Sequence, residues 1–293
     1  MNIYAFLMLG IITTVYCYNQ KNKEIFQKMF MVDGEPQESM KIPPGSKSIT
    51  FLKNFKMQMK DIIFPDSVES IILCSNIDIG NIYFSDTIKS ISFAGDFNSP
   101  IDNIKFPSSL TELNICGVFN YSLSDVIFPD TLETLCLGGS FNHSINKIKF
   151  PDSLVTLEFG GDFNNPFVKV KFPPNLKHLK FNGKFNQFLK CKLPDSLESL
   201  ELCGKYNKSI DELCFPQSLK KITFGGRFDK ALNNIQFGVE ELVFFNIKHN
   251  IDNLPASIKK IKLMRNDLIL LIKKIPHDCI IVDKNDMILN KFL

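Results

Sequence analysis

Apolar residues return along this chain in short alternating stretches at a nearly fixed spacing. Residues 154–159 read Leu-Val-Thr-Leu-Glu-Phe, and the apolar positions at their end alternate as in a strand with one buried face. The dipeptide Gly160-Gly161 follows, where we expect a turn because glycine adopts backbone angles that other residues avoid. A second apolar stretch ends at Phe172-Pro173, since proline cannot donate a hydrogen bond to a sheet.

This stretch is one copy of a unit about 22 residues long. Its marker is the sequence Phe-Pro-x-Ser-Leu, which recurs in steps of 20 to 22 residues. The marker begins at Ile42, Phe64, Phe106, Phe128, Phe150, Phe172, Leu193 and Phe215, with a weakened copy at Phe84 and degenerate copies at Phe237, Leu254 and Ile275. A period of this length is typical of solenoids, and the count predicts about eleven coils.

The predicted fold is a repeat solenoid, mainly β, with leucine-rich-repeat-like coils of about 22 residues and a parallel concave sheet. A single coil cannot bury its own Leu and Phe, whereas stacked coils bury them in one continuous core. Because 22 residues are too few for a strand, a helix and two turns, we expect a short strand or an irregular segment on the other side. The predicted boundaries are 1–41 for a hydrophobic leader or cap, 42–272 for the solenoid and 273–293 for a C-terminal cap.

A Phe-Asn pair occupies a second fixed place in each unit. In "FNSPIDNIKFPSSLTELNICG", residues 97–117, this pair, an apolar residue, Phe-Pro and Ser-Leu occur together. The sequence resembles the FNIP repeat, a relative of leucine-rich repeats found in social amoebae and giant viruses of amoebae. The resemblance covers residues 42 to about 272 and implies a protein-interaction role. Some family members carry an F-box beside the repeats, but residues 1–41 lack its leucine and proline opening.

Composition narrows the class of partner. The 34 basic and 31 acidic residues leave a net charge of +3, so the chain lacks the strong positive charge that phosphate neutralisation requires. We therefore expect no nucleic acid partner. The 28 Phe residues and the absence of Trp indicate one structural position filled repeatedly by the same aromatic residue.

The N-terminus and the eight cysteines bear on the cellular compartment. Ile3–Tyr18 is uncharged and has the length of a secretory hydrophobic region, although no Lys or Arg precedes it. Cys74, Cys116 and Cys203 share one position in non-adjacent coils, too far apart for disulfides. We favour an intracellular, cytoplasmic protein with free thiols; the alternative is a secreted protein in which residues 1–17 are a signal peptide. Membrane contact is expected only if Ile3–Tyr18 is an anchor.

The sequence shows no pattern of residues that catalysis requires. The histidines His143, His178, His249 and His277 occupy different repeat positions, and we find no catalytic triad order, paired-carboxylate motif or phosphate-binding loop. The cysteines also lack the spacing of a zinc site. We therefore expect no enzyme activity, no cofactor, no metal and no small-molecule substrate.

The candidate binding residues flank the middle leucine of the strands. Side chains alternate between the two faces of a strand, so these residues point away from the core. The residues expected to contact an unidentified protein partner are Glu112, Asn114, Thr156, Glu158, His178, Lys180, Glu201 and Lys221. This row also ends basic, at Lys260 and Lys262. Their chemistry varies between coils while the inward residues stay nearly constant, as expected of a recognition surface on a fixed scaffold.

Other repeated polar positions have simpler interpretations. Lys105, Lys149, Lys171 and Lys192 form a stripe that is either a solvated edge or a site for an acidic partner. The asparagines of the Phe-Asn pairs are predicted to hydrogen-bond backbone groups of the turns. Three of them, Asn120, Asn142 and Asn207, also begin glycosylation sequons. Two functions remain open: a protein-recognition scaffold, or a structural or secreted surface protein without a specific ligand.

Overall fold

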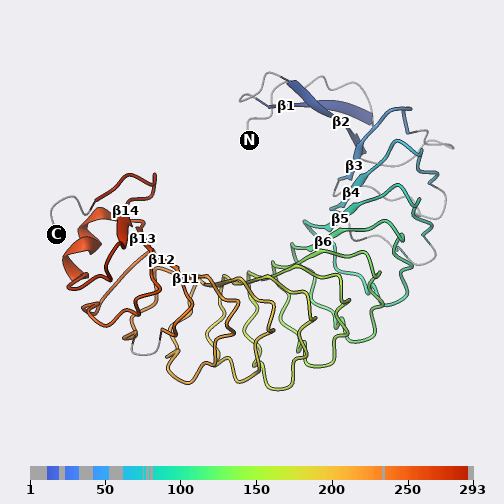
Figure 1. The fold of residues 1–293 in the computed structure, drawn as a ribbon. Helices are drawn as coiled ribbons and strands as arrows, with labels where there is room; N and C mark the ends of the chain where they lie inside the picture. The colour runs from blue at the N-terminus through green and yellow to red at the C-terminus, as the bar shows by residue number, and fades with distance from the viewer. Residues whose placement is uncertain are drawn as a thin grey trace. The chain divides into compact units, whose positions relative to one another are not determined.

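The structure is a computed structural model of the chain. It describes residues 12–19, 24–32, 42–52, 62–74, 76, 79, 82–232 and 235–289. The chain divides into two compact units, residues 1–143 and residues 144–293. Figure 1 traces the successive coils of each unit.

The first unit begins with an antiparallel pair of strands, β1 (Ile12–Asn19) and β2 (Glu24–Val32). Strand β2 pairs in parallel with β3 (Ser48–Phe51). Parallel strands then follow in chain order: β4 (Ser70–Leu73), β5 (Ser90–Phe93), β6 (Glu112–Ile115) and β7 (Thr134–Leu137). Much of the run Ile3–Tyr18 thus lies outside the described residues or in β1, and its role as leader or cap stays a prediction.

The second unit has the same organisation. Its strands are β8 (Thr156–Phe159), β9 (His178–Phe181), β10 (Ser199–Leu202), β11 (Lys221–Phe224), β12 (Glu241–Phe244), β13 (Lys260–Leu263) and β14 (Ile280–Val282). Each pairs in parallel with the next along the chain. A 3-10 helix, η2 (Asn266–Leu271), lies between β13 and β14.

The core repeats from coil to coil as the hydrophobic pattern predicts. In most strands the second and fourth residues are buried, as Leu157 and Phe159 are in β8. The aromatic residue of the Phe-Asn pair packs beneath them, and the ring of Phe163 stacks on that of Phe185 with centroids 6.0 Å apart. Phe163 is completely buried. Phe185 stacks in turn on Tyr206 with centroids 6.0 Å apart, so the same aromatic position is filled in successive coils, which explains the excess of Phe.

The turns after β5 to β10 depend on glycine with a positive φ. Gly183 has a φ of +60°, and a Cβ atom there would lie 2.1 Å from the carbonyl oxygen of Gly161. The equivalent Gly204 has the same φ, and its Cβ would lie 2.3 Å from the carbonyl oxygen of Gly183. Successive turns thus stack backbone on backbone, at a distance that only glycine permits.

These observations confirm the predicted fold, a mainly β solenoid with coils of about 22 residues and parallel strands. The side opposite the sheet is irregular, as expected, with an isolated parallel bridge between Phe167 and Leu189. The helix η2 differs from the expectation that helices are absent. It forms where the chain has lost both the glycine turn and the Phe-Asn pair, so that residues 266–271 close the coil by local hydrogen bonds.

The last described residues fold back on the final strand. The N–H of Leu289 donates a hydrogen bond to the carbonyl oxygen of Ile281 at 2.8 Å, and Val282 bridges to Ile288 in antiparallel orientation. This return covers the free edge of β14, which would otherwise expose unpaired backbone groups.

Candidate interaction surface

The outward face of the strands carries the predicted binding residues. The first and third residues of β8, β9 and β10 are half-buried while the second and fourth are buried. Alternation thus places Thr156 and Glu158, His178 and Lys180, and Ser199 and Glu201 on the outward face of these strands. In β11 this holds for Lys221, whereas Thr223 is buried.

Glu158, Lys180 and Glu201 form a row of alternating charge across three strands. The sheet register places Glu158 opposite Lys180, and Lys180 opposite Glu201. The ammonium group of Lys180 lies 3.8 Å from the Oε1 atom of Glu201, and both side chains are about one-third exposed. The amide of Asn182 donates to Glu158 at 3.1 Å. Neighbouring groups thus hold the row in place while leaving it accessible.

A second row runs beside the first. The Nδ1 atom of His178 lies 2.8 Å from the hydroxyl of Ser199, and Lys221 forms an ion pair with Glu241 at 3.2 Å. Thr156 lies opposite His178 in the register. This row presents a hydroxyl, an imidazole, a hydroxyl and an ammonium group in succession.

In the first unit the same positions belong to Glu112 and Asn114 of β6. The amide of Asn114 donates to Glu112 at 2.8 Å and to the hydroxyl of Ser92 at 3.4 Å. Because Glu112 and Asn114 belong to the first unit and the other candidates to the second, the structure brings together only the residues within each unit.

Lys260 and Lys262, which were expected to make the end of the row basic, are paired with a carboxylate in the structure. The carboxylate of Asp286 forms ion pairs with the ammonium groups of Lys260 and Lys262, each at 2.8 Å. The ammonium group of Lys260 also lies 3.9 Å from the carboxylate of Glu241. Hydrogen bonds from both lysines lower the pKa of Asp286 to about 2, and the bond with Asp286 raises the pKa of Lys260. The sequence pattern missed this because Asp286 lies on the returning segment, outside the repeat.

The asparagines form the predicted hydrogen-bonded ladders. The Oδ1 atom of Asn98 accepts from the backbone N–H of Asn120, and that of Asn120 from Asn142, at 3.1 and 3.0 Å. In the second unit, Asn186 and Asn207 bond in the same way at 2.9 Å. The structural interpretation of these residues is therefore confirmed. Of the three sequon asparagines, Asn120 and Asn142 are exposed and Asn207 is half-buried.

The cysteine positions agree with their predicted place in the repeat. Cys74, Cys116 and Cys203 each follow directly after a strand, in coils that are not adjacent. Cys74, Cys191, Cys203 and Cys214 are free thiols. Burial raises the pKa of Cys191 and of Cys203 to about 11, so both thiols stay protonated at neutral pH.

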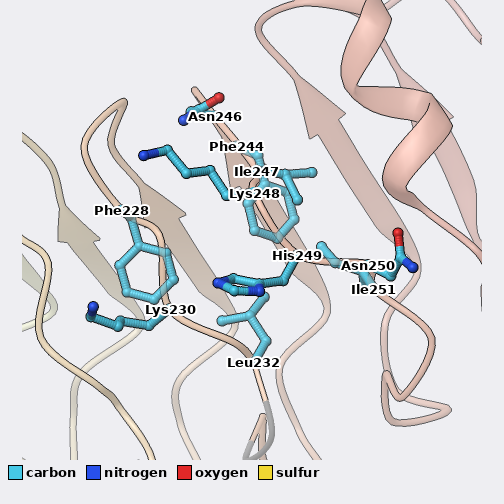
Figure 2. A pocket seen from close by; sticks show the side chains of 10 residues that line it. All are labelled: Phe228, Lys230, Leu232, Phe244, Asn246, Ile247, Lys248, His249, Asn250 and Ile251. Carbon is cyan, nitrogen blue, oxygen red and sulfur yellow. The ribbon is translucent and has the colours of Figure 1, made fainter.

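A pocket lies in the second unit, where the repeat becomes irregular. Figure 2 shows its ten lining side chains, with the imidazole of His249 near the centre of the group: Phe228, Lys230, Leu232, Phe244, Asn246, Ile247, Lys248, His249, Asn250 and Ile251. The ammonium groups of Lys230 and Lys248 lie 3.0 and 3.7 Å from the carboxylate of Asp229. The Nε2 atom of His249 lies 2.6 Å from the carbonyl oxygen of Asp229. Asp229 thus already engages the cationic groups of the pocket.

The described residues contain neither a cluster of metal-ligand side chains nor a helix suited to a membrane. No three His, Cys, Asp or Glu side chains among them are grouped as metal ligands would be. None of the helices in that part of the chain is long and apolar enough to cross a membrane.

The repeat is similar to a known family and to solved leucine-rich-repeat structures. The model of the FNIP repeat matches residues 119–162, 163–205 and 206–237. No curated protein matches the chain. Among solved structures, CroV588, described as a novel circular LRR protein, is 20% identical with a TM-score of 0.41; the alignment covers 86% of this chain and 48% of CroV588. YopM from Yersinia enterocolitica WA-314 is 14% identical with a TM-score of 0.38, over 87% of this chain and 68% of YopM. This chain therefore spans about half the length of CroV588.

Proposed function

The chain contains FNIP repeats, at residues 119–237, and from this premise we propose that it is a non-enzymatic scaffold that binds another protein through the outward face of its strands. The observation that carries the proposal is the contrast between the two faces of β8–β11. The inward face repeats Leu, Ile and Phe, whereas the outward face changes from coil to coil. A rigid frame with a varied polar face fits selective recognition of one surface.

The chemistry of this face favours a protein over a nucleic acid. Glu158, Lys180 and Glu201 alternate in sign, and a phosphate backbone of uniform negative charge would meet two carboxylates for each ammonium group. A polypeptide of mixed charge can oppose each group with its complement. The hydroxyl and imidazole groups of Thr156, His178 and Ser199 add neutral hydrogen-bonding positions beside the charged row.

The test begins with proximity labelling in the native cell to identify the partner, followed by a binding measurement with purified proteins. The decisive variant is the triple substitution E158K/K180E/E201K, which inverts each charge and keeps the alternation along the row. Because opposite charges still face each other, we expect the melting temperature to stay near that of the wild type. Affinity for the partner should fall by roughly tenfold or more.

A matched control is D162K/K184D, which exchanges the two charges of an ion pair in the turns of the same unit. Asp162 lies 2.7 Å from Lys184, and neither belongs to the proposed contact row. The control should bind like the wild type. Unchanged affinity of the triple variant, with its fold intact, would rule out this face.

A further inference from the structure

Six lysines lie together on the side of the second unit opposite the sheet. They occupy two positions, two residues apart, in three successive coils: Lys147 and Lys149, Lys169 and Lys171, Lys190 and Lys192. All six are exposed. In the first two coils the residue between the lysines points inward, since Ile148 is 5% exposed and Val170 is 8% exposed, and in the third coil Cys191 is half-buried. Both lysines of a coil thus face the solvent on the same side.

Hydrogen bonds and pairing hold the three coils in register. The backbone N–H of Lys169 donates to the Oδ1 atom of Asn146, one coil earlier, at 3.3 Å. Phe167 pairs with Leu189 in a parallel bridge between the second and third coils. The lysines therefore form two columns that run across the three coils, with neighbouring coils about 4.8 Å apart where they pair. We call this grid the six-lysine patch.

The positive charge of the patch is only partly neutralised. Lys192 forms an ion pair with Asp195 at 2.8 Å, and exposed Asp152 holds the equivalent place after Lys149. In the middle coil that place is taken by Pro174, so no carboxylate follows Lys171 there. Six lysines and two aspartates give a formal charge of +4, more than the +3 of the whole chain. The next coil carries Asp211 and Glu212 near the corresponding positions, which ends the patch.

An aromatic side chain borders the patch and is already engaged. Phe188 is 46% exposed, and the ammonium groups of Lys190 and Lys208 lie 5.7 and 5.2 Å from its ring centroid. Cations at this distance are attracted to the ring face. The ring therefore fixes two of the local ammonium groups, and is less available as a platform on which a nucleotide base would stack.

We propose that the six-lysine patch binds an acidic polypeptide segment. The patch contains lysines and no arginine. Lysine acts as a point charge, whereas arginine provides the bidentate geometry that favours phosphate. The net positive charge of the patch is complementary to the carboxylates of an acidic segment that lies across the three coils. This proposal is independent of the proposed function, because the six-lysine patch and the outward face of the strands share no residue and are tested with different variants.

The experiment measures binding of the full chain to a synthetic peptide with glutamate at alternate positions, by fluorescence anisotropy at low and at physiological salt. An oligothymidylate of equal charge and vesicles of phosphatidylcholine with phosphatidylserine serve as competing probes. We expect the peptide to bind most tightly, with affinity falling as salt rises. K169E/K171E should weaken the peptide complex by roughly tenfold or more, because it reverses the two central charges.

The matched control is K273E/K274E, two exposed lysines of the same unit outside the patch. It should bind the peptide like the wild type, and K169Q/K171Q provides a neutral variant if the reversed charges disturb folding. An equal loss in the patch variant and the control would show nonspecific attraction and overturn the proposal. Tighter binding of the oligonucleotide or of the vesicles, or no binding of the peptide, would also overturn it.

Discussion

The side-chain oxygen of Asn186 accepts a hydrogen bond from the backbone N–H of Asn207, one coil further along the chain, at 2.9 Å. The same bond joins Asn164 to Asn186 at 2.8 Å and Asn207 to Asp229 at 3.0 Å. Each rung satisfies a turn N–H that the regular ladder of the strands does not reach.

Removing one rung should destabilise the second unit. Asn186→Ala leaves the N–H of Asn207 without its acceptor and is expected to cost about 1–3 kcal/mol of unfolding free energy. Urea denaturation followed by circular dichroism measures the loss. Asn186→Asp keeps an acceptor oxygen and should lose less; equal losses for the two variants would contradict the role of that oxygen.

The stacked rings should be more sensitive than exposed apolar side chains. Phe163→Ala removes a completely buried ring that stacks on Phe159 and Phe185, and it should cost about 3–5 kcal/mol. Val168→Ala, at a position 56% exposed, should change stability by less than about 0.5 kcal/mol. Denaturation curves of both variants make the comparison, and a loss below about 1 kcal/mol for Phe163→Ala would show that the ring does not support the core.

One glycine should tolerate no side chain at all. Gly183→Ala combines a positive φ with a contact of 2.1 Å to backbone, so we expect a loss above about 2 kcal/mol or failure to fold. Gly226→Ala is the control, because a Cβ there meets nothing within 4 Å. Soluble yield and melting temperature distinguish the two, and a stable Gly183→Ala protein would mean that the turns stack less closely.

The contact of Asp286 with Lys260 and Lys262 should depend on pH. The pKa of Asp286 lies at about 2, below its ordinary value of 3.8, so its stabilising effect is full above the ordinary value and disappears as pH falls towards 2. Asp286→Asn should therefore increase hydrogen exchange in residues 280–289 at neutral pH. The difference from wild type should shrink below pH 3.8; a difference that persists unchanged down to pH 2 would exclude the carboxylate as its source.

The thiols should differ in reactivity. Cys214 is exposed, whereas burial raises the pKa of Cys191 and Cys203 to about 11. Because the thiolate is the reactive form, iodoacetamide should modify Cys214 first in the folded protein. Peptide mass spectrometry gives the order. Disulfides, or glycan on Asn120, Asn142 or Asn207, would instead favour the secreted alternative.

The sequence predicted the fold because one period determines the inward residues, the turns and the asparagine ladder together. The same periodicity placed Thr156, Glu158, His178, Lys180, Glu201 and Lys221 on the outward face. It missed the second lysine column, Lys147, Lys169 and Lys190, although their alternation with buried Ile148 and Val170 was a readable signal. The repeat pattern could not predict the contacts of Asp286 or the helix η2, because both lie where the repeat ends and contacts between distant residues determine the structure.

The hydrogen bond between Asn164 and Asn186 and the one between Asn186 and Asn207 join equivalent atoms, a side-chain Oδ1 and a backbone N–H. The asparagine of each coil therefore donates its backbone N–H to the preceding coil and accepts, through its Oδ1 atom, from the following coil. A chain shortened by residues 164–185 would bring Asn186 directly after Phe163, in the place where Asn164 now stands. Unequal exchange between such segments during gene duplication would alter the length of the protein in whole coils while its cross-section stays the same.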